Sequence, residues 1–235
     1  MIGNMPFVYQ IKANFIGIKW VFIPINFMLI QIHPTHPQPR QLAMVADCLQ
    51  SGGIIAYPTD TIYGLGCSIF KQDAIEKICA IKKVDPEKAN LSFICADLSD
   101  LSLYAKSIDN SLFRILKKAL PGPFTFILPA SKEVPKILQS RKKTIGLRIP
   151  DNLIALSIIK TLGHPILSAS FPGDEVEEYT DPELIQENWG KQIDMVVDGG
   201  IGGINPSTVV DCTTDHYEII RQGAGVCDYQ KQTRI

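Results

Sequence analysis

The sequence predicts a single α/β domain built on a twisted, mixed β-sheet. Helical and strand-like patterns alternate along the chain without a long linker, which is typical of α/β folds. Hydrophobic residues make up 46% and charged residues 20% of the 235 positions, a composition that supports a folded core. Internal repeats and low-complexity tracts are absent from the sequence. One α/β domain therefore accounts for most of the chain.

The helices are predicted from apolar residues spaced three and four positions apart. The first such segment ends at a pair of glycines, a residue type favoured just past a helix end. Asp73 is the expected N-cap of the second helix, and Asp109 and Asp151 precede the next two. The expected helices span 38–51, 73–83, 109–120 and 152–162.

The strands are predicted from short runs of β-branched and aromatic residues bounded by turn residues. The acidic segment 171–183, "FPGDEVEEYTDPE", is expected to be the longest loop, exposed and mobile. The expected strands span 54–58, 91–96, 124–129, 145–149, 166–170, 193–198, 207–211 and 217–221.

The N-terminal 27 residues differ from the rest of the chain. The apolar run 20–30, "WVFIPINFMLI", is too short to span a bilayer, so no membrane association is expected. Two lysines precede it, as in a signal peptide, but no A-x-A-like cleavage site follows. We expect an apolar extension over 1–27 upstream of a natural start at Met28, a domain over 28–228 and a tail over 229–235.

Charge and cysteine usage exclude several classes of protein. The formal net charge of −1 does not by itself indicate a nucleic-acid or membrane partner. The six cysteines form no C-x-x-C pair, and the four histidines lack metal-ligand spacing relative to them. Buried free thiols, a cytoplasmic location and the absence of a bound metal site are therefore expected.

Small hydroxyl, glycine and cationic residues gather beside the predicted strands. Each has an ordinary explanation when taken alone: Thr125 as a strand former, Arg148 as a surface ion-pair partner. Ligands of open α/β sheets, however, bind outside strand ends, where separate segments converge. These motifs are "PTDT" (58–61), "PGPFTFIL" (121–128), "GLRIP" (146–150), "SAS" (168–170), "PSTVVD" (206–211) and "RQG" (221–223). We expect them to line one hollow suited to an anionic ligand.

Two common nucleotide-binding motifs are excluded. The segment "GLGCSI" lacks the third glycine of a dinucleotide fingerprint. The glycine-rich segment 199–208, "GGIGGINPST", lacks the lysine of a phosphate-binding loop. Any nucleotide must be held by another arrangement.

The same motifs, in the same succession, resemble the YrdC-like family, which includes threonylcarbamoyl-AMP synthases. The resemblance runs from about Ile32 to Gly225, and "IEKICAIKKVDP" and "KEVPKILQSRKKTIG" look most like its YciO branch. It implies a twisted mixed sheet with an open concave surface flanked by helices. It also implies an ATP-using nucleotidyltransferase that joins L-threonine and bicarbonate into threonylcarbamoyl-AMP for tRNA modification, with Mg²⁺ accompanying the ATP.

The resemblance also implies roles for particular residues, although it assigns no catalytic residue. Arginine suits such a site because its planar guanidinium binds two oxygens of an anion at once. The substrate would contact Thr59, Lys83, Arg148 and Ser170. The nucleotide would contact Thr125, Ser168, Ser207 and Arg221.

The chain departs from the synthase pattern at three places. With Pro86 as the anchor, Asp85 stands where the family has an arginine, and an anion there repels a triphosphate. The segment 90–94, "NLSFI", lacks the family histidine, and Ser170 replaces the family asparagine. The alternative is a YciO-type nucleotide- and RNA-binding protein without synthase activity.

Binding of tRNA or double-stranded RNA is the other activity that the resemblance implies. Double-stranded RNA is bound largely through shape and phosphate contacts, so clustered basic residues suffice. The expected RNA contacts are Lys82, Lys88, Arg141, Lys142 and Lys143; together with the run Lys117-Lys118 and Arg148 they are expected to form one positive face. Each basic run, taken singly, is also what a solvated helix or loop face contains.

Overall fold

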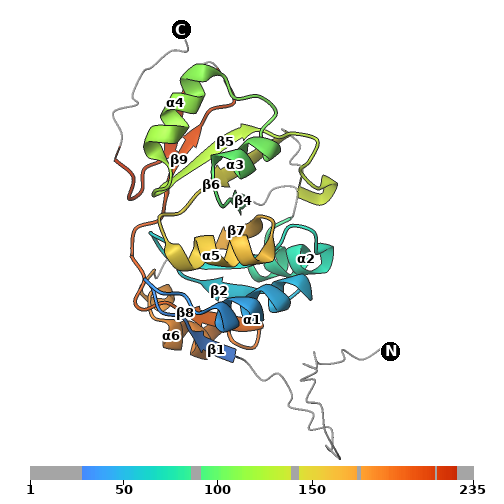
Figure 1. Ribbon diagram of the computed structural model, residues 1–235, viewed down its shortest axis with the longest axis vertical. Helices are drawn as coiled ribbons and strands as arrows, with labels where there is room; N and C mark the ends of the chain where they lie inside the picture. The colour runs from blue at the N-terminus through green and yellow to red at the C-terminus, as the bar shows by residue number, and fades with distance from the viewer. Residues whose placement is uncertain (1–27, 86–90, 139–142, 174–175, 215, 227–235) are drawn as a thin grey trace, which may run out of the picture.

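The computed structural model describes residues 28–85, 91–138, 143–173, 176–214 and 216–226. Ten strands of these residues form one mixed sheet in the order β1-β8-β2-β3-β7-β4-β6-β5-β9-β10. The molecule is elongated along the sheet, with β1 at one end and β9 and α4 at the other (Figure 1). The predicted α/β class with a mixed sheet is confirmed. The expected segments 1–27 and 229–235 lie outside the described residues.

The strands, in chain order, have the following bounds. They are β1 (Met28–Gln31), β2 (Ile55–Tyr57), β3 (Gly64–Ser68), β4 (Ser92–Ile94), β5 (Phe124–Pro129), β6 (Thr144–Arg148), β7 (Ile166–Ser170), β8 (Met195–Asp198), β9 (Thr208–Asp211) and β10 (Glu218–Arg221). Parallel pairs (β1–β8, β2–β8, β4–β6 and β5–β9) mix with antiparallel ones, and most sheet neighbours are not consecutive in the chain. Side chains that share a sheet face therefore come from distant parts of the sequence.

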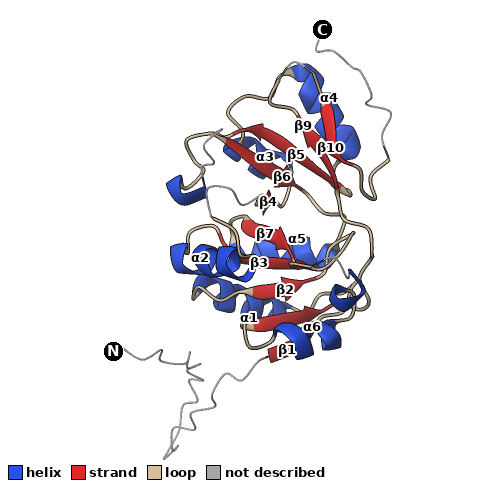
Figure 2. Ribbon diagram, turned by 180° about the vertical axis from the view of Figure 1, so that it is seen from behind, coloured by secondary structure: helices blue, strands red, loops and turns tan. Residues whose placement is uncertain are grey.

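The helices lie on the two faces of this sheet (Figures 1 and 2). They are α1 (Pro39–Gln50), α2 (Gln72–Ile81), α3 (Leu98–Tyr104), α4 (Asn110–Ala119), α5 (Leu153–Leu162) and α6 (Pro182–Trp189), with short 3-10 turns η1 (Lys136–Leu138) and η2 (Val176–Tyr179). Within the described residues, no helix is both long and apolar enough to cross a lipid bilayer.

One face of the sheet is buried along its length. Alternate strand residues such as Leu65, Phe93, Phe126 and Leu147 form the main core there, and each is fully buried. The helices that pack on this core contribute Ile75, Ile78, Leu101, Leu112, Leu116 and Ile185. Burial at about 25 cal/mol per Å² of apolar area makes this core the main source of stability.

The other face is covered only in part. Helices α1 and α5 pack against each other and bury the apolar strand residues Ile55, Tyr57, Ile94, Ile166, Met195 and Val197, which we call the covered half. Helix α5 is well delimited: the Asn152 side chain accepts a hydrogen bond from the Ala155 backbone N–H at 3.0 Å, and Gly163 ends the helix with φ of 83°. Beyond α5 the face carries mostly small or polar residues, together with Ile127 and Val209 at its far side. We call this region the open half: Ser92, Thr125, Ile127, Thr144, Gly146, Ser168, Ser170 and Val209.

Several local expectations were wrong. Strand β3 (Gly64–Ser68), in the middle of the sheet, and helices α3 and α6 were not expected. Helix α2 begins after Lys71, so Asp73 lies in its first turn and does not cap it. The cap of α5 is the side chain of Asn152 and not that of Asp151.

The segment 171–183 is only partly the exposed loop that was expected. Phe171 and Tyr179 are buried, and their rings stack with centroids 5.0 Å apart. The Tyr179 hydroxyl donates a hydrogen bond to the Pro172 carbonyl, and Trp189 of α6 packs against both rings. Aromatic packing therefore fixes the ends of this segment against the main core.

Candidate ligand-binding site

A hollow of about 330 Å³ opens on the open half of the sheet. Its floor is a row of cross-strand partners, Ser168 on β7, Ser92 on β4 and Gly146 on β6. No side chain in this row is larger than a hydroxymethyl group, so the floor is deep and offers hydroxyls. The hollow falls within the range of about 300–1,000 Å³ that is usual for small-molecule sites.

The walls bring together most of the predicted site residues. The predicted contacts that line the hollow are Thr59, Thr125, Arg148, Ser168, Ser170, Ser207 and Arg221. They come from β5, β6, β7, β10 and two loops, and strand order places them side by side. The sequence-based expectation of one shared hollow thus has a structural counterpart. The role of each residue toward a ligand stays a prediction.

The "PTDT" motif forms a tight turn at one wall. Thr59 Oγ1 accepts a hydrogen bond from the Thr61 backbone N–H at 3.0 Å and donates to the Ile62 carbonyl at 2.7 Å. These bonds fix the turn that follows Pro58, as Thr and Ser side chains often do. This turn places Asp60 and Thr61 in contact with Arg148.

Arg148 and Asp60 form a nearly buried ion pair at this wall. Arg148 Nη2 lies 2.5 Å from Asp60 Oδ1 and donates to Thr61 Oγ1 at 2.8 Å. The side chains are only 9% and 10% exposed. Arg148 Nε and Asp60 Oδ2 are both buried with no hydrogen-bond partner within the described residues. One bond of the guanidinium–carboxylate fork is made, and the matching donor and acceptor of the second bond are unsatisfied.

Arg221 is held at a second wall by neutral oxygens. Its Nε and Nη2 donate to the Ser207 carbonyl at 3.1 and 2.8 Å, and Nη2 also reaches Ser207 Oγ at 3.1 Å. Ser207 Oγ lies 2.9 Å from Thr125 Oγ1. Burial, and then the nearby Arg148 charge, lower the pKa of Arg221. Its charge has no carboxylate partner among the described residues.

Lys82 supplies the third cation, from the C-terminal end of α2. Its Nζ donates to the Ser170 carbonyl at 2.8 Å and to Ser170 Oγ at 3.3 Å. Burial lowers the pKa of Lys82, Cys79 opposes that shift, and the Arg221 charge adds to it. Lys82 lies at the rim through its contact with Ser170 and, like Lys83, is not among the residues that line the hollow. Lys83, which was expected at the substrate, is exposed and has φ of 54°.

The net electrostatics of the hollow favour an anion. Arg148, Arg221 and Lys82 are positive, and Asp60 is the carboxylate that contacts one of them. Arg221 and Lys82 bond only to neutral oxygens in the part of the chain that the structure describes, so their charges are not compensated there. Clustered cations whose pKa values are lowered by burial and by one another are typical of anion-binding sites.

An apolar patch completes the hollow on the side of β9 and β10. It consists of Ile127, Val209 and Ile220, and Ile220 is 52% exposed. Val209 is the cross-strand partner of Arg221, so this patch adjoins one of the uncompensated cations. A ligand with a flat apolar part and an anionic part matches this arrangement.

Tyr57 explains the glycines of the "YGLG" segment. Its hydroxyl lies 2.6 Å from Ser168 Oγ, at the border between the covered half and the hollow. A Cβ added to Gly64 or Gly66 would lie 3.1 or 3.0 Å from the Tyr57 ring. These glycines make room for a buried tyrosine; a close approach of ligand to backbone is not needed to account for them.

Sequence reasoning gave no role to several residues of the site. Asp60 and Thr61 stood inside a quoted motif, but only their contact with Arg148 shows their function. Ser92 and Tyr57 carried a weaker signal: a hydroxyl in the apolar run "LSFICA" and a tyrosine at the end of a buried strand. Lys82, which was expected at RNA, contacts Ser170 at the rim of the hollow, and its role toward RNA stays a prediction.

Among the described residues, the basic run Lys117-Lys118 does not share the face that carries the hollow. Lys117 and Lys118 are on α4, which packs on the main core and therefore on the opposite face of the sheet from the hollow. Lys143 is exposed, with φ of 53°. Lys88, Arg141 and Lys142 lie outside the described residues. The RNA surface stays a prediction.

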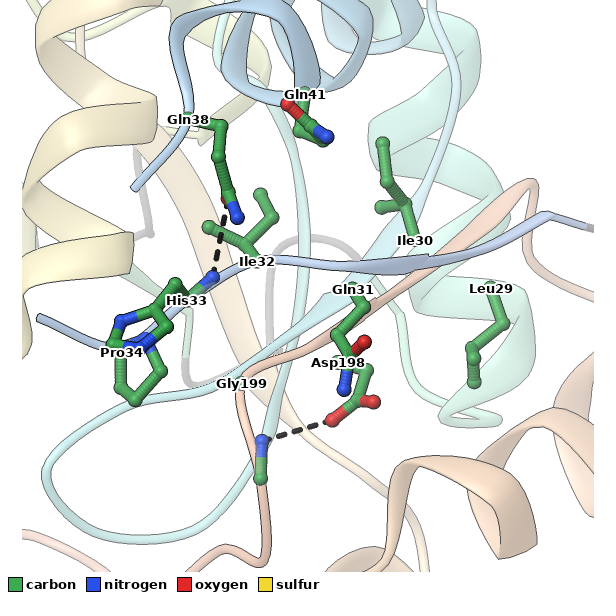
Figure 3. Close-up of a pocket in the computed structure, with 11 residues that line it drawn as sticks. Leu29, Ile30, Gln31, Ile32, His33, Pro34, Gln38, Gln41, Asp198 and Gly199 are labelled. Carbon is green, nitrogen blue, oxygen red and sulfur yellow. Dashed lines mark hydrogen bonds between the residues drawn. The ribbon is translucent and has the colours of Figure 1, made fainter. Parts of the chain in front are cut away.

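A larger hollow of about 630 Å³ lies elsewhere, between β1, the start of α1 and the end of β8 (Figure 3). The Asp198 carboxylate accepts a hydrogen bond from the Gly200 backbone N–H at 2.9 Å, and Gln38 accepts one from the His33 backbone N–H at 3.2 Å. No Lys or Arg is among its lining residues. Despite its size, this hollow lacks the convergent cations of the smaller one, which we take as the candidate site.

The fold and the hydroxyl-lined hollow define a class of protein, and comparison with known families identifies it. The family model Sua5/YciO/YrdC, described as "Telomere recombination", matches residues 47–223. The chain therefore belongs to the Sua5/YciO/YrdC family.

Two relatives mark its place within that family. "Uncharacterized protein YciO" of Escherichia coli K12 is 44% identical over 197 residues, which cover 83% of this chain and 94% of that one. A "Threonylcarbamoyl-AMP synthase" of Coxiella burnetii is 31% identical over 175 residues, covering 74% and 92%. The chain is thus more similar to YciO than to this synthase.

Solved structures give the same ranking. The crystal structure of E. coli YciO aligns with a TM-score of 0.81 at 40% identity and covers 86% of this chain and 98% of that one. The structure of P. abyssi Sua5 "complexed with L-threonine" aligns with a TM-score of 0.74 at 27% identity, covering 83% and 57%. The expected resemblance to the family, closest to its YciO branch, is confirmed.

Proposed function

We propose that this chain is a nucleotide-binding protein of the YciO type and that the hollow on the open half is its binding site. The observation that carries the proposal is the pairing of uncompensated cations with an apolar patch in one cavity. Arg221 and Lys82 attract phosphate, and Ile127, Val209 and Ile220 offer a surface to a base. The hydroxyls of Thr125, Ser168 and Ser207 line the same hollow and offer donors and acceptors to a ribose or phosphate.

Magnesium would enter the site with a triphosphate. Among the described residues there is no group of three His, Cys, Asp or Glu side chains placed to hold a metal ion. Asp60, the carboxylate at this wall, already contacts Arg148. Mg²⁺ keeps several waters and binds readily through phosphate oxygens, so the residues present fit an ion carried by ATP and not one resident in the protein.

A second candidate is synthesis of threonylcarbamoyl-AMP from ATP, L-threonine and bicarbonate. The observation in its favour is that Thr59 and Arg148, the expected substrate contacts, line the same hollow as the expected nucleotide contacts. Two features oppose it. Ile94, the last residue of the segment that lacks the family histidine, is buried in the covered half. Asp85, at the expected arginine position, is exposed. These substitutions favour binding without this chemistry.

Calorimetry with ATP and Mg²⁺ tests the first proposal. The wild-type chain is expected to bind ATP, and Arg221→Gln is expected to weaken binding by about tenfold or more, since 1.4 kcal/mol of lost interaction corresponds to a factor of ten. Arg114→Gln on the exposed face of α4 removes the same charge at a distance from the hollow and is the matched control. Absence of ATP binding, or equal losses in the two variants, would refute the proposal.

Pyrophosphate release separates the two candidates. The protein is incubated with ATP, Mg²⁺ and bicarbonate, with and without L-threonine. A binding protein releases no pyrophosphate above the rate without threonine. Threonine-dependent release that Thr59→Val abolishes would instead establish the synthase. Because Thr59 also holds its turn, the variant's fold is checked by its circular dichroism spectrum.

A further inference from the structure

We infer that Asp60 sets the anion preference of the hollow by acting as a built-in competitor for Arg148. This inference deepens the proposed function, since it takes the hollow as the binding site. It divides the cations into two kinds. Arg148 is already neutralised by a protein carboxylate, and Arg221 and Lys82 are available to a ligand.

The contact geometry supports the role of competitor. Asp60 holds Arg148 by one short bond, from Nη2 to Oδ1 at 2.5 Å, while Arg148 Nε and Asp60 Oδ2 remain buried without partners in the described chain. A carboxylate held through both arms of the guanidinium would satisfy these two atoms. The pair is therefore incompletely satisfied, and a buried donor without an acceptor has a cost. A second anion that reaches the Arg148 guanidinium from the hollow would not contact the buried Nε and would meet the Asp60 charge.

The position of the pair makes this competition relevant to a ligand. Arg148 lines the hollow, and Thr125 and Gly146 beside it also line it. Asp60 is not among the lining residues and contacts Arg148 from the turn that Thr59 fixes. A ligand anion that reaches Arg148 must therefore share the guanidinium with Asp60. Anionic groups are directed toward Arg221 and Lys82, and polar groups without net charge are favoured at Arg148.

The Asp60 charge also affects the interaction between Arg148 and Arg221. Arg148 lowers the pKa of Arg221, so the two cations repel across the hollow. Asp60 moderates this repulsion in the protein without ligand. Removing its charge raises the positive potential of the whole hollow, and a small anion is then expected to bind more tightly and with a steeper dependence on salt.

The test measures binding of inorganic pyrophosphate, without magnesium, by calorimetry. Asp60→Asn keeps the size of the side chain and removes its charge. This variant is expected to bind pyrophosphate at least about tenfold more tightly than wild type. A gain of this size corresponds to one additional charge contact in a partly buried site. Asp60→Glu retains the charge and is expected to keep the wild-type affinity. Asp198→Asn, which removes a carboxylate from the other hollow, is the control and is expected to change little.

The double variant Asp60→Asn with Arg148→Gln locates the effect. If Asp60 acts through Arg148, the gain in pyrophosphate affinity disappears in the double variant. If Asp60→Asn binds no tighter than wild type, or if the gain persists without Arg148, the inference is wrong. Should Asp60→Asn be folded but too unstable for calorimetry, pyrophosphate is expected to raise its Tm more than that of wild type, and an equal or smaller rise overturns the inference.

The experiments distinguish failure of this inference from failure of the proposed nucleotide binding. Wild-type ATP binding with no gain in Asp60→Asn would retain the function and remove the inference. A gain in pyrophosphate affinity in a protein that does not bind ATP would do the reverse. If neither ligand binds to any variant, both fail.

Discussion

The covered and open halves of one sheet face differ in residue type although they share the same pleat. Strand β7 crosses the border: Ile166 lies under α5, whereas Ser168 and Ser170 on the same side of the strand face the hollow. Strand β4 shows the same change, from Ile94 under the helix to Ser92 in the floor of the hollow. Side chains alternate in the same way on both sides of the border. The two halves differ because helices α1 and α5 pack over one of them and not over the other.

This difference separates residues that stabilise the fold from residues that bind a ligand. A position beneath a helix gains from apolar burial, about 25 cal/mol per Å². A hydroxyl in an open hollow gains little stability from the protein, because water can replace most of its partners. Serines and glycines that interrupt an apolar strand on one face therefore indicate where a helix does not cover the sheet.

The strongest test of this comparison is Arg148→Ala at the border. Asp60 is only 10% exposed in the intact pair, and removing Arg148 takes away its cation. Breaking a buried pair by removing one partner typically costs about 3–5 kcal/mol. Urea unfolding of the variant should show a loss of this order in the free energy of unfolding.

The double variant Arg148→Ala with Asp60→Ala sharpens the result. It removes both charges, so it is expected to be more stable than Arg148→Ala alone. A loss below about 1 kcal/mol in the single variant, typical of an exposed pair, would show that solvent reaches the pair and that the border is not where we place it.

Replacing one isoleucine by alanine in each half is expected to affect stability in the covered half and ligand binding in the open half. Ile158 of α5 is fully buried over the covered half, and Ile158→Ala should cost about 2–5 kcal/mol of stability. Ile127 lines the hollow and is only partly buried, so Ile127→Ala should cost about 1 kcal/mol or less. Ile127→Ala should weaken ATP binding instead. Equal losses of stability in urea would break the comparison.

The sequence predicted much of this architecture because most strands are chemically distinct. Runs such as "FTFILP" and "MVVD" are rich in residues that suit a pleated sheet. Strand β3, "GLGCS", escaped prediction because glycines ordinarily mark turns, and only the neighbouring Tyr57 ring explains them. Helix α6 carried a recognisable start, with Asp181 as its cap and Pro182 as its first residue, but the acidic run around it suggested a loop.

The sequence predicted several of the residues that line the candidate site but not which of them contact one another. The order of motifs assigned the hydroxyls and arginines to one hollow, yet Asp60 and Arg148 are 88 positions apart, and their pairing depends on the tertiary fold. Lys82 and Lys83 show a second limit. The backbone leaves α2 at Lys82, and Lys83 follows with φ of 54°, so the exposed Lys83 side chain does not share the direction of Lys82, whose Nζ contacts Ser170.

The smallest expected effect comes from Tyr57→Phe, which removes the hydroxyl group at the border of the covered half. At neutral pH the variant should lose about 0.5–1.5 kcal/mol with the hydrogen bond to Ser168, at the lower end if water in the hollow replaces it. Burial raises the pKa of Tyr57 from 10.0 to about 12 in the folded protein. The unfolded chain therefore ionises first, and wild-type stability falls as the pH rises above about 10.

Phenylalanine has no such titration, so the stability gap between wild type and Tyr57→Phe should shrink as the pH rises from about 10 toward 12. Urea unfolding of both proteins at about pH 8, 10 and 11 measures this gap. A gap that stays constant over this range would mean that the hydroxyl ionises as easily in the folded protein as in the unfolded chain. In that case Tyr57 would belong to the open half, and the border would lie on the α5 side of its ring.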